Sequence, residues 1–212
     1  MAISLVKLPT KKRGLNLRVC KGHFATNHSH INYYIDVTAQ KFRLNEAKAV
    51  AQELTAEYKY RGAVDTILCL DGTEVIGACM ASDLVKSGVF TSNEHGSLYV
   101  VTPEHTTGSQ LIFRENTMPM IAGKHVLVLL ASVSTGYTAE AALQAIRYYG
   151  GKTVGIAAIF ATVKEVDGMP VTHIFDTSDL SDYSSWEPRN CPLCQQGKKL
   201  DALVNSYGYS NL

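Results

Sequence analysis

Apolar runs and helical periods alternate along the chain, and their order predicts an α/β protein. The run from Val126 to Ala131 consists of Val, Leu and Ala, as in a strand buried on both faces. A helix-forming segment, Ala139–Tyr149, follows after a short turn, and Thr138 is the expected N-cap of that helix. The centre of the chain therefore predicts a strand, a tight turn and a helix in direct succession.

The flanking segments repeat this arrangement. In Leu44–Tyr60, apolar residues recur every three or four positions, which predicts a helix with Asn45 as N-cap and Gly62 just beyond its end. Further expected elements are strands over Val64–Leu70, Ser97–Val101, Gln110–Phe113 and Val154–Ala161, a helix over Val75–Lys86, and a hairpin whose Asp-Gly turn precedes Val171–Phe175. Strands that alternate with helices favour a mainly parallel sheet flanked by helices.

The two ends of the chain show weaker patterns. Leu15–Val19 alternates apolar and polar residues, which predicts a short strand, and Cys20–Asp36 is expected to be a polar loop that ends in an extended segment. Leu200–Asn205 is expected to form a short helix or turn. Because no long linker interrupts the sequence, we expect a single domain over 1–212, in which a 1–40 hood segment and a 181–212 tail flank a 41–180 α/β core.

Composition adds three limits. The 212 residues are enough to bury one core, and a net charge of +1 gives no indication of nucleic-acid binding. No apolar run is long enough to span a membrane. The five cysteines are odd in number and scattered, which favours a reduced, cytoplasmic protein over a disulfide-linked one.

The turn after the central strand carries the candidate chemistry. The first amides of a helix have no partner within it, and the helix dipole attracts negative charge to them. Ser134, Thr135 and Thr138 add hydroxyl donors. Gly136, followed by Tyr137, lets a phosphate approach the backbone closely. These five residues predict a phosphate-monoester site, with an ordinary strand-to-helix turn as the alternative.

This turn resembles the phosphoribosyl-diphosphate (PRPP) motif of type I phosphoribosyltransferases, specifically that of the orotate phosphoribosyltransferases. The motif has four apolar residues, two acidic residues, two variable ones, and then Thr-Gly and a small residue. Its hydroxyl-glycine half matches at Ser134–Thr138, whereas Leu130 and Ala131 stand where the family has its acidic pair. In the family, that pair contacts the ribose hydroxyls of PRPP and helps to stabilise the developing ribosyl cation. The resemblance also implies a homodimer, and Mg²⁺ that enters with PRPP.

Two further segments resemble parts of the family's site. Asp71, Gly72 and Thr73 follow a predicted strand, where the family has its pyrophosphate loop. Acidic residues there repel a pyrophosphate unless Mg²⁺ lies between them, and an ordinary turn is the alternative. Phe24 and the pair Tyr33-Tyr34 match the outline of the segment that covers the base in the family.

The family's mobile loop, which carries Arg and Lys, corresponds to Thr102–Gly108 and contains neither residue type here. The nearest cations are Arg114 and Lys124. His105 is a candidate proton donor because histidine titrates near neutral pH, and a solvent-exposed histidine without a role is the alternative.

Near the end of the chain, Cys191 and Cys194 form a C-x-x-C pair, which suits a zinc knuckle or a redox pair. One such pair supplies half of a structural Zn²⁺ site. Cys20, His23 or another histidine of the N-terminal segment would have to supply the rest. The alternatives are a redox element and two reduced thiols packed in a turn. The pair also resembles a Cys-Pro-x-Cys-x-x-Gly tail of some members of the orotate branch.

The resemblance implies an enzyme of pyrimidine biosynthesis, a pentosyltransferase that moves a phosphoribosyl group from PRPP to a pyrimidine base such as orotate. The alternative is a regulatory module that binds a nucleotide or PRPP with little or no transfer, which the missing acidic pair and loop cations favour. A third function is a regulator that uses the C-x-x-C pair as a metal or redox element. The sequence assigns no catalytic residue.

Overall fold

The computed structural model describes residues 4–8, 14–86, 97–107 and 110–212, so Gly108 of the expected mobile loop lies outside the described residues. The chain divides into two compact units, Gln40–Asp176 and a second one formed by Met1–Ala39 together with Thr177–Leu212. Each unit contains its own sheet. The expectation that the whole chain acts as a single domain stays a prediction.

The larger unit contains a six-stranded sheet in the order β10-β11-β9-β8-β4-β5. Its strands are β4 (Thr66–Cys69), β5 (Tyr99–Val101), β8 (His125–Val133), β9 (Lys152–Ala161), β10 (Glu165–Val166) and β11 (Met169–Asp176). Neighbouring strands pair in parallel except β10, which forms an antiparallel hairpin with β11. The mainly parallel sheet expected from the sequence is confirmed.

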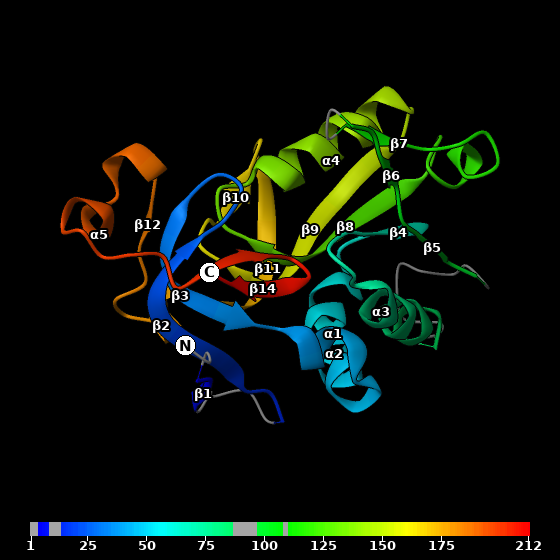
Figure 1. Ribbon diagram of the computed structural model, residues 1–212. Coiled ribbons are helices and arrows are strands. Elements are labelled where there is room, and N and C mark those ends of the chain that lie inside the picture. The colour runs from blue at the N-terminus through cyan, green and yellow to red at the C-terminus, as the bar shows by residue number, and fades with distance from the viewer. Residues whose placement is uncertain (1–3, 9–13, 87–96, 108–109) are drawn as a thin grey trace. The chain divides into compact units, whose positions relative to one another are not determined.

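Helices cover both faces of this sheet (Figure 1). They are α2 (Leu44–Tyr58), α3 (Glu74–Lys86) and α4 (Tyr137–Tyr148), and a short helix, α1 (Thr38–Phe42), precedes α2. α4 packs on one face, against β8 and β9, whereas α2 and α3 pack on the other face. A small hairpin of β6 (Glu104–His105) and β7 (Leu111–Ile112) and a 3₁₀ turn, η2 (Met118–Met120), connect β5 to β8.

The helix α2 begins earlier than its expected cap. Arg43, with the extended angles φ −92° and ψ 114°, is the N-cap, and its side chain makes no capping hydrogen bond. Asn45 therefore lies in the first turn, and the expectation that it caps the helix is wrong. The apolar face was predicted correctly, because Ala47, Val50 and Leu54 are all buried.

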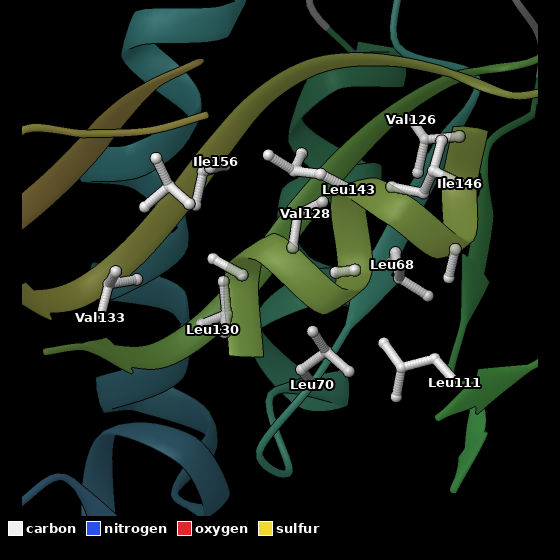
Figure 2. Packing of buried hydrophobic residues seen from close by; sticks show 14 of the residues in the cluster. Leu68, Leu70, Leu111, Val126, Val128, Leu130, Val133, Leu143, Ile146 and Ile156 are labelled. Atoms are coloured by element: carbon white, nitrogen blue, oxygen red, sulfur yellow. The ribbon is translucent and has the colours of Figure 1, made fainter. Parts of the chain in front are cut away.

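A continuous apolar cluster fills the space between the sheet and α4 (Figure 2). It includes Leu68, Leu70, Val126, Val128, Leu130, Leu143, Ile146 and Ile156, all at most 4% exposed. Each fully buried Leu or Ile side chain contributes about 2 kcal/mol of transfer free energy. This packing holds the carboxyl ends of β4 and β8 in fixed positions.

The smaller unit contains a sheet in the order β12-β3-β2-β13-β14, with β1 also paired to β2. Its elements are β1 (Val6–Leu8), β2 (Leu17–Ala25), β3 (His30–Asp36), η3 (Thr177–Asp179), β12 (Ser185–Trp186), η4 (Pro188–Asn190), α5 (Pro192–Gln195), β13 (Ala202–Asn205) and β14 (Gly208–Asn211). The N-terminal and C-terminal segments of the chain thus share one sheet, in which β13 pairs in parallel with β2.

Two expectations for this unit are wrong. The polar loop expected from Cys20 onward is instead the second half of β2 and a turn into β3, in which the Ser29 amide donates to the Thr26 hydroxyl at 2.9 Å. The strand expected at Leu15–Val19 and the extended end of the loop segment are confirmed as parts of β2 and β3. The segment expected to be a final helix or turn is strand β13, where Ala202 and Val204 are buried and Leu203 is exposed. This alternation of buried and exposed residues is the period of a strand. No described helix has the length and apolar character needed to cross a membrane.

Candidate functional site

The order of the strands in the larger unit identifies one position for a ligand. From β4 the chain crosses to β5 on one side, and it then returns past β4 to β8 and continues through β9 to β11. The direction of winding therefore reverses between β4 and β8. In open α/β sheets, ligands bind at the carboxyl ends of the strands at such a switch point. The turns after β4 and β8 are the two turns predicted to bind phosphate groups.

The turn after β8 has the geometry of an anion site. Gly136 is the N-cap of α4 in the left-handed conformation, with φ 86°. The first intrahelical hydrogen bond runs from the Glu140 amide to the Gly136 carbonyl at 2.8 Å. The amides of Thr138 and Ala139 precede that donor and have no acceptor within the helix. These amides and the helix dipole together favour a bound anion.

Thr138 is not the N-cap expected from the sequence, because the helix begins at Tyr137 and Thr138 lies in its first turn. Thr135, Tyr137 and Thr138 are exposed, whereas Ser134 is half-buried. The structure therefore places two predicted hydroxyl donors, those of Thr135 and Thr138, at the surface beside the first turn of α4.

Glycine is required at position 136 for two reasons. An L side chain rarely adopts φ 86°, and a Cβ atom built there would lie 3.1 Å from Cγ2 of Val166, on the β10–β11 hairpin. Behind the turn, the Thr162 hydroxyl donates to the carbonyl of Ser134 at 2.7 Å, and the Thr162 amide donates to that of Val133 at 2.9 Å. The end of β9 thus holds the backbone of the candidate phosphate turn.

A buried threonine stabilises the turn after β4 through its hydroxyl group. Asp71 and Gly72 both have positive φ, 59° and 75°. Thr73 is fully buried, and its hydroxyl lies 2.8 Å from the carbonyl of Leu70 and 3.2 Å from that of Leu129 on β8. Thr73 therefore links the two strands at the switch point, which makes it a structural member of the predicted pyrophosphate loop.

Lys41 is a charged residue of this region that the sequence analysis missed. Its side chain is 1% exposed, and its Nζ donates to the backbone carbonyl of Asp71 at 2.7 Å. The same Nζ lies 3.5 Å from the position that a Cβ on Gly72 would take. The ammonium group of Lys41, on α1, thus lies beside the predicted pyrophosphate loop. A lysine within a short polar stretch carries no pattern by which the sequence could have identified it.

The positions of the family's acidic pair lie inside the core. Leu130 is fully buried in the cluster under α4, beside Val133 and Leu70 (Figure 2), and Ala131 is 2% exposed. No carboxylate therefore occupies the end of β8. Instead, the apolar side chains of Leu130 and Val133 extend the hydrophobic core to the end of the strand.

Arg114, one of the two cations nearest to the segment that corresponds to the family's mobile loop, forms an ion pair with Glu104 of β6. Arg114 Nη2 lies 2.6 Å from Glu104 Oε2, and Arg114 Nε lies 3.0 Å from Oε1 of the same carboxylate. This hydrogen bonding lowers the pKa of Glu104 and raises that of Arg114. The guanidinium is thus engaged on its own hairpin. His105, the candidate proton donor, is exposed on β6.

In the smaller unit, the residues predicted to cover a base lie on two faces of the hairpin. Phe24 and Tyr34 are buried in the apolar cluster of this unit, with ring centroids 6.1 Å apart. Tyr33 lies on the other face of β3, where its hydroxyl donates to Asp182 Oδ1 at 2.7 Å. Neighbouring residues of a strand face opposite sides, so these three rings do not form one stacking surface. A role in base binding stays a prediction.

The C-x-x-C pair lies in the smaller unit, at the start of α5. Cys191 is fully buried and Cys194 is exposed. Their sulfur atoms lie next to the imidazoles of His23 and His30, with all four ligand atoms within 4.8 Å of one another. Cys20, which the sequence offered as a further ligand, is not part of this group.

A pocket of the larger unit lies away from the switch point, near the amino ends of β9 and β11. Leu143, Arg147, Lys152 and Asp167 are among the residues that line it. Arg147 and Asp167 form an ion pair of 2.8 Å there. Ligands of open parallel sheets bind at the carboxyl ends of the strands, so this pocket is not part of the candidate site.

No protein-family model matches the chain. The chain is 23% identical over 178 residues to orotate phosphoribosyltransferase from Desulforamulus reducens, over 83% of this chain and 84% of the relative. UMP synthase from Leishmania donovani superposes with a TM-score of 0.54 and 17% identity, over 76% of this chain and 34% of that one. Adenine phosphoribosyltransferase from Thermoanaerobacter pseudethanolicus superposes with a TM-score of 0.52 and 15% identity, over 82% of this chain and 95% of that one.

The fold is thus shared with a UMP synthase and with an adenine phosphoribosyltransferase, two proteins whose names differ. The fold alone does not select among bases, whereas the similarity of sequence is to an orotate enzyme. Both comparisons agree with the resemblance seen at Ser134–Thr138. The chain therefore has the fold of the type I phosphoribosyltransferases, and its sequence is similar to that of an orotate phosphoribosyltransferase.

Proposed function

We propose that the chain binds PRPP at the β4–β8 switch point and transfers its phosphoribosyl group to a pyrimidine base such as orotate. A ring nitrogen of the base forms the new bond to C1′ of the ribose, and the bond from C1′ to the pyrophosphate oxygen breaks. Pyrophosphate leaves with the bonding electron pair, and the proton of the ring nitrogen passes to water or to the departing pyrophosphate. The observation that carries this proposal is the pair of turns, after β4 and after β8, at the one edge where the winding of the sheet reverses.

Each turn has a role in this proposal. The amides of Thr138 and Ala139, with the hydroxyl of Thr135, bind the 5′-phosphate at the N-terminus of α4. The Asp71–Thr73 turn binds the pyrophosphate. Lys41 supplies positive charge next to that turn, through the ammonium that donates to the Asp71 carbonyl. This charge partly offsets the absence of Lys and Arg from the segment Thr102–Thr107.

Mg²⁺ enters with PRPP in this proposal, as a counter-ion of the pyrophosphate. Mg²⁺ prefers oxygen ligands and is commonly held by one or two carboxylates together with substrate phosphates. Asp71 and Glu74 provide carboxylates at the turn after β4, and Glu74 lies in the first turn of α3. The residues present therefore fit the ion, which would screen the repulsion between these carboxylates and the pyrophosphate.

The alternative function is a module that binds PRPP or a nucleotide without efficient transfer. The observation that favours it is Leu130, which is fully buried where the family has a carboxylate. Removal of one group that stabilises charge in a transition state costs about 3–4 kcal/mol, or roughly a hundredfold to a thousandfold in rate. Binding of the 5′-phosphate does not depend on this pair, because it uses the turn after β8.

The two functions differ in one assay. The full chain is incubated with PRPP, orotate and Mg²⁺, and orotidylate and pyrophosphate are measured, with uracil and adenine as alternative bases. Formation of orotidylate by the wild type, but not by Gly136→Val, supports transfer. Saturable binding of PRPP without product supports the binding module. Absence of both binding and product contradicts both functions.

A cytoplasmic location and a homodimer are further parts of the proposal. The five cysteines of the described residues are all free, which suits a reducing compartment.

Light scattering of the purified chain measures the oligomeric state, and a monomer at micromolar concentration would contradict the dimer.

A further inference from the structure

We propose that His23, His30, Cys191 and Cys194 bind one Zn²⁺ in a closed, four-coordinate site of the smaller unit. These residues supply two thiolates and two imidazoles, which is a common ligand set of structural zinc sites. The proposal concerns Met1–Ala39 and Thr177–Leu212 only, and it does not depend on the phosphoribosyl site.

The separations of the four ligand atoms fit one central ion. His23 Nε2 lies 3.2 Å from His30 Nδ1, 3.4 Å from Cys191 Sγ and 3.7 Å from Cys194 Sγ. Cys194 Sγ lies 3.3 Å from His30 Nδ1. A tetrahedral Zn²⁺ with its usual bond lengths separates two nitrogens by roughly 3.4 Å and a nitrogen from a sulfur by roughly 3.6 Å. The observed edges agree with these values within a few tenths of an ångström.

The hydrogen bonds of His23 leave the correct nitrogen for a metal. Its Nδ1 lies 2.9 Å from the carbonyl oxygen of Lys198 and 3.3 Å from that of Lys199. Carbonyl oxygens only accept, so Nδ1 carries the proton and Nε2 presents a lone pair. A hydrogen bond from the ring nitrogen that does not bind the metal to a backbone carbonyl is the arrangement that usually orients a metal-binding histidine. One lone pair cannot serve His30, Cys191 and Cys194 at once, whereas a cation between them can.

The backbone around His23 directs its side chain toward the other three proposed ligands. The pairing of β2 with β3 shifts register between Lys21 and Phe24, and such a bulge redirects a side chain. Asp201 holds the bulge, because the His23 amide donates to Asp201 Oδ2 at 2.7 Å and the Asp201 amide donates to the His23 carbonyl at 2.7 Å. A Cβ atom on Gly22 would lie 2.7 Å from that carboxylate oxygen, so only glycine fits beside it.

The two cysteines are held in a compact turn of the kind that zinc knuckles use. Cys191 is the N-cap of α5, and its carbonyl accepts from the Gln195 amide at 3.2 Å. The Gly197 amide donates a hydrogen bond to the carbonyl of Cys194 at 2.9 Å, and Gly197 has a φ of 72°. All four coordination positions come from the protein, so the ion has no open position for catalysis. Its role is to fix the α5 turn on the β2–β3 hairpin.

The first experiment uses the wild-type chain, expressed without a metal-binding tag and purified in the presence of reductant. Elemental analysis is expected to find about one Zn²⁺ per chain. Replacement by Co²⁺ is expected to give the intense visible bands of a tetrahedral ion and a sulfur-to-metal charge-transfer band. A zinc-free protein whose Co²⁺ titration shows neither band would overturn the proposal, as would a disulfide between Cys191 and Cys194 in the native protein.

The second experiment compares ligand variants with matched controls. Cys194→Ser and His30→Ala change side chains that are not fully buried, so the fold should tolerate them. Both are expected to lower the affinity for Zn²⁺ at least tenfold in competition with a chelator. Cys20→Ser and His28→Ala, which lie outside the group, are expected to keep the wild-type affinity. Equal affinities for all four variants would contradict the assignment of the ligands.

Discussion

The hydroxyl of Thr162 donates to the carbonyl oxygen of Ser134 at 2.7 Å, which ties the end of β9 to the turn that is proposed to bind the 5′-phosphate. The Thr162 amide reinforces this link through the carbonyl of Val133 at 2.9 Å. The turn therefore has a fixed backbone before any ligand arrives. Such preorganisation lowers the conformational entropy that binding has to overcome.

Thr162→Val removes the hydroxyl and keeps the shape of the side chain. We expect the affinity for ribose 5-phosphate to fall by about fivefold, because a hydrogen bond of this kind contributes about 1 kcal/mol. Calorimetric titration measures the change. Thr162→Ser, which keeps the hydroxyl, is the control, and an equal loss of affinity in both variants would show that the hydrogen bond is not responsible.

Gly136→Val is expected to abolish binding of ribose 5-phosphate and of PRPP. The side chain would need a φ of 86° and would press on Val166 Cγ2, so the turn must change its backbone. Gly150→Val is the matched control, because Gly150 has φ 77° at the other end of α4 and no atom lies within 4 Å of its built Cβ. It imposes the backbone strain without touching the site. Loss of affinity in both variants would indicate general destabilisation.

Lys41→Met is expected to lower the affinity for PRPP and to leave the affinity for ribose 5-phosphate almost unchanged. Without the ammonium, the turn at Asp71 loses a charged donor at 2.7 Å and the pyrophosphate loses a nearby positive charge. Hydrogen bonds of charged groups contribute about 1.5–3 kcal/mol, so the affinity for PRPP should fall at least tenfold. The affinity for ribose 5-phosphate, which lacks the pyrophosphate, should stay within about twofold of the wild type.

The control for this variant is Lys48→Met, which removes an exposed lysine of α2. Its affinity for both ligands is expected to be that of the wild type. If Lys41→Met weakened the binding of ribose 5-phosphate as much as that of PRPP, the proposed place of the pyrophosphate would be wrong.

Cys69 predicts a pH dependence of stability. Burial raises the pKa of its thiol from 9.0 to about 12. The unfolded chain therefore releases this proton at a lower pH than the folded chain does. The resulting stabilisation is fully present below pH 9 and is lost as the pH rises from about 9 to about 12.

Cys69→Ala tests this dependence. At pH 7 the variant is expected to be less stable than the wild type by about 1 kcal/mol, because it leaves a small cavity beside Gly77. The difference should shrink as the pH rises above 9, since only the wild type has the thiol to ionise. Urea unfolding at pH 7, 9 and 10.5 measures it. A difference that is constant over this range would contradict the raised pKa.

The central strand and its turn were predictable from local signals. The Val- and Leu-rich run of β8, and the small residues that end it, specify their own structure, and the apolar face of α2 does so as well. The β2–β3 hairpin was missed because the bulge at His23 breaks the alternation of a strand. Strand β13 was missed because four residues are too few to show a period against the signal of a short helix.

The remaining parts of the site depend on tertiary pairing. His23 and Cys191 are 168 positions apart, and they meet only because the C-terminal strands join the sheet of the N-terminal hairpin. Lys41 reaches the carbonyl of Asp71 across 30 positions. Neither contact has a local signal in the sequence. The C-x-x-C spacing identified two of the four proposed metal ligands, and the three histidines of the N-terminal segment contained the other two.

The central claim is that a phosphate monoester binds to the amides at the start of α4. A titration of the ¹⁵N-labelled chain with ribose 5-phosphate, followed by NMR, tests it most directly. The account predicts saturable chemical-shift changes that are largest at Thr135, Gly136, Thr138 and Ala139, and their loss in Gly136→Val. Saturation without changes at these amides, or the absence of any change at millimolar ligand, would contradict it.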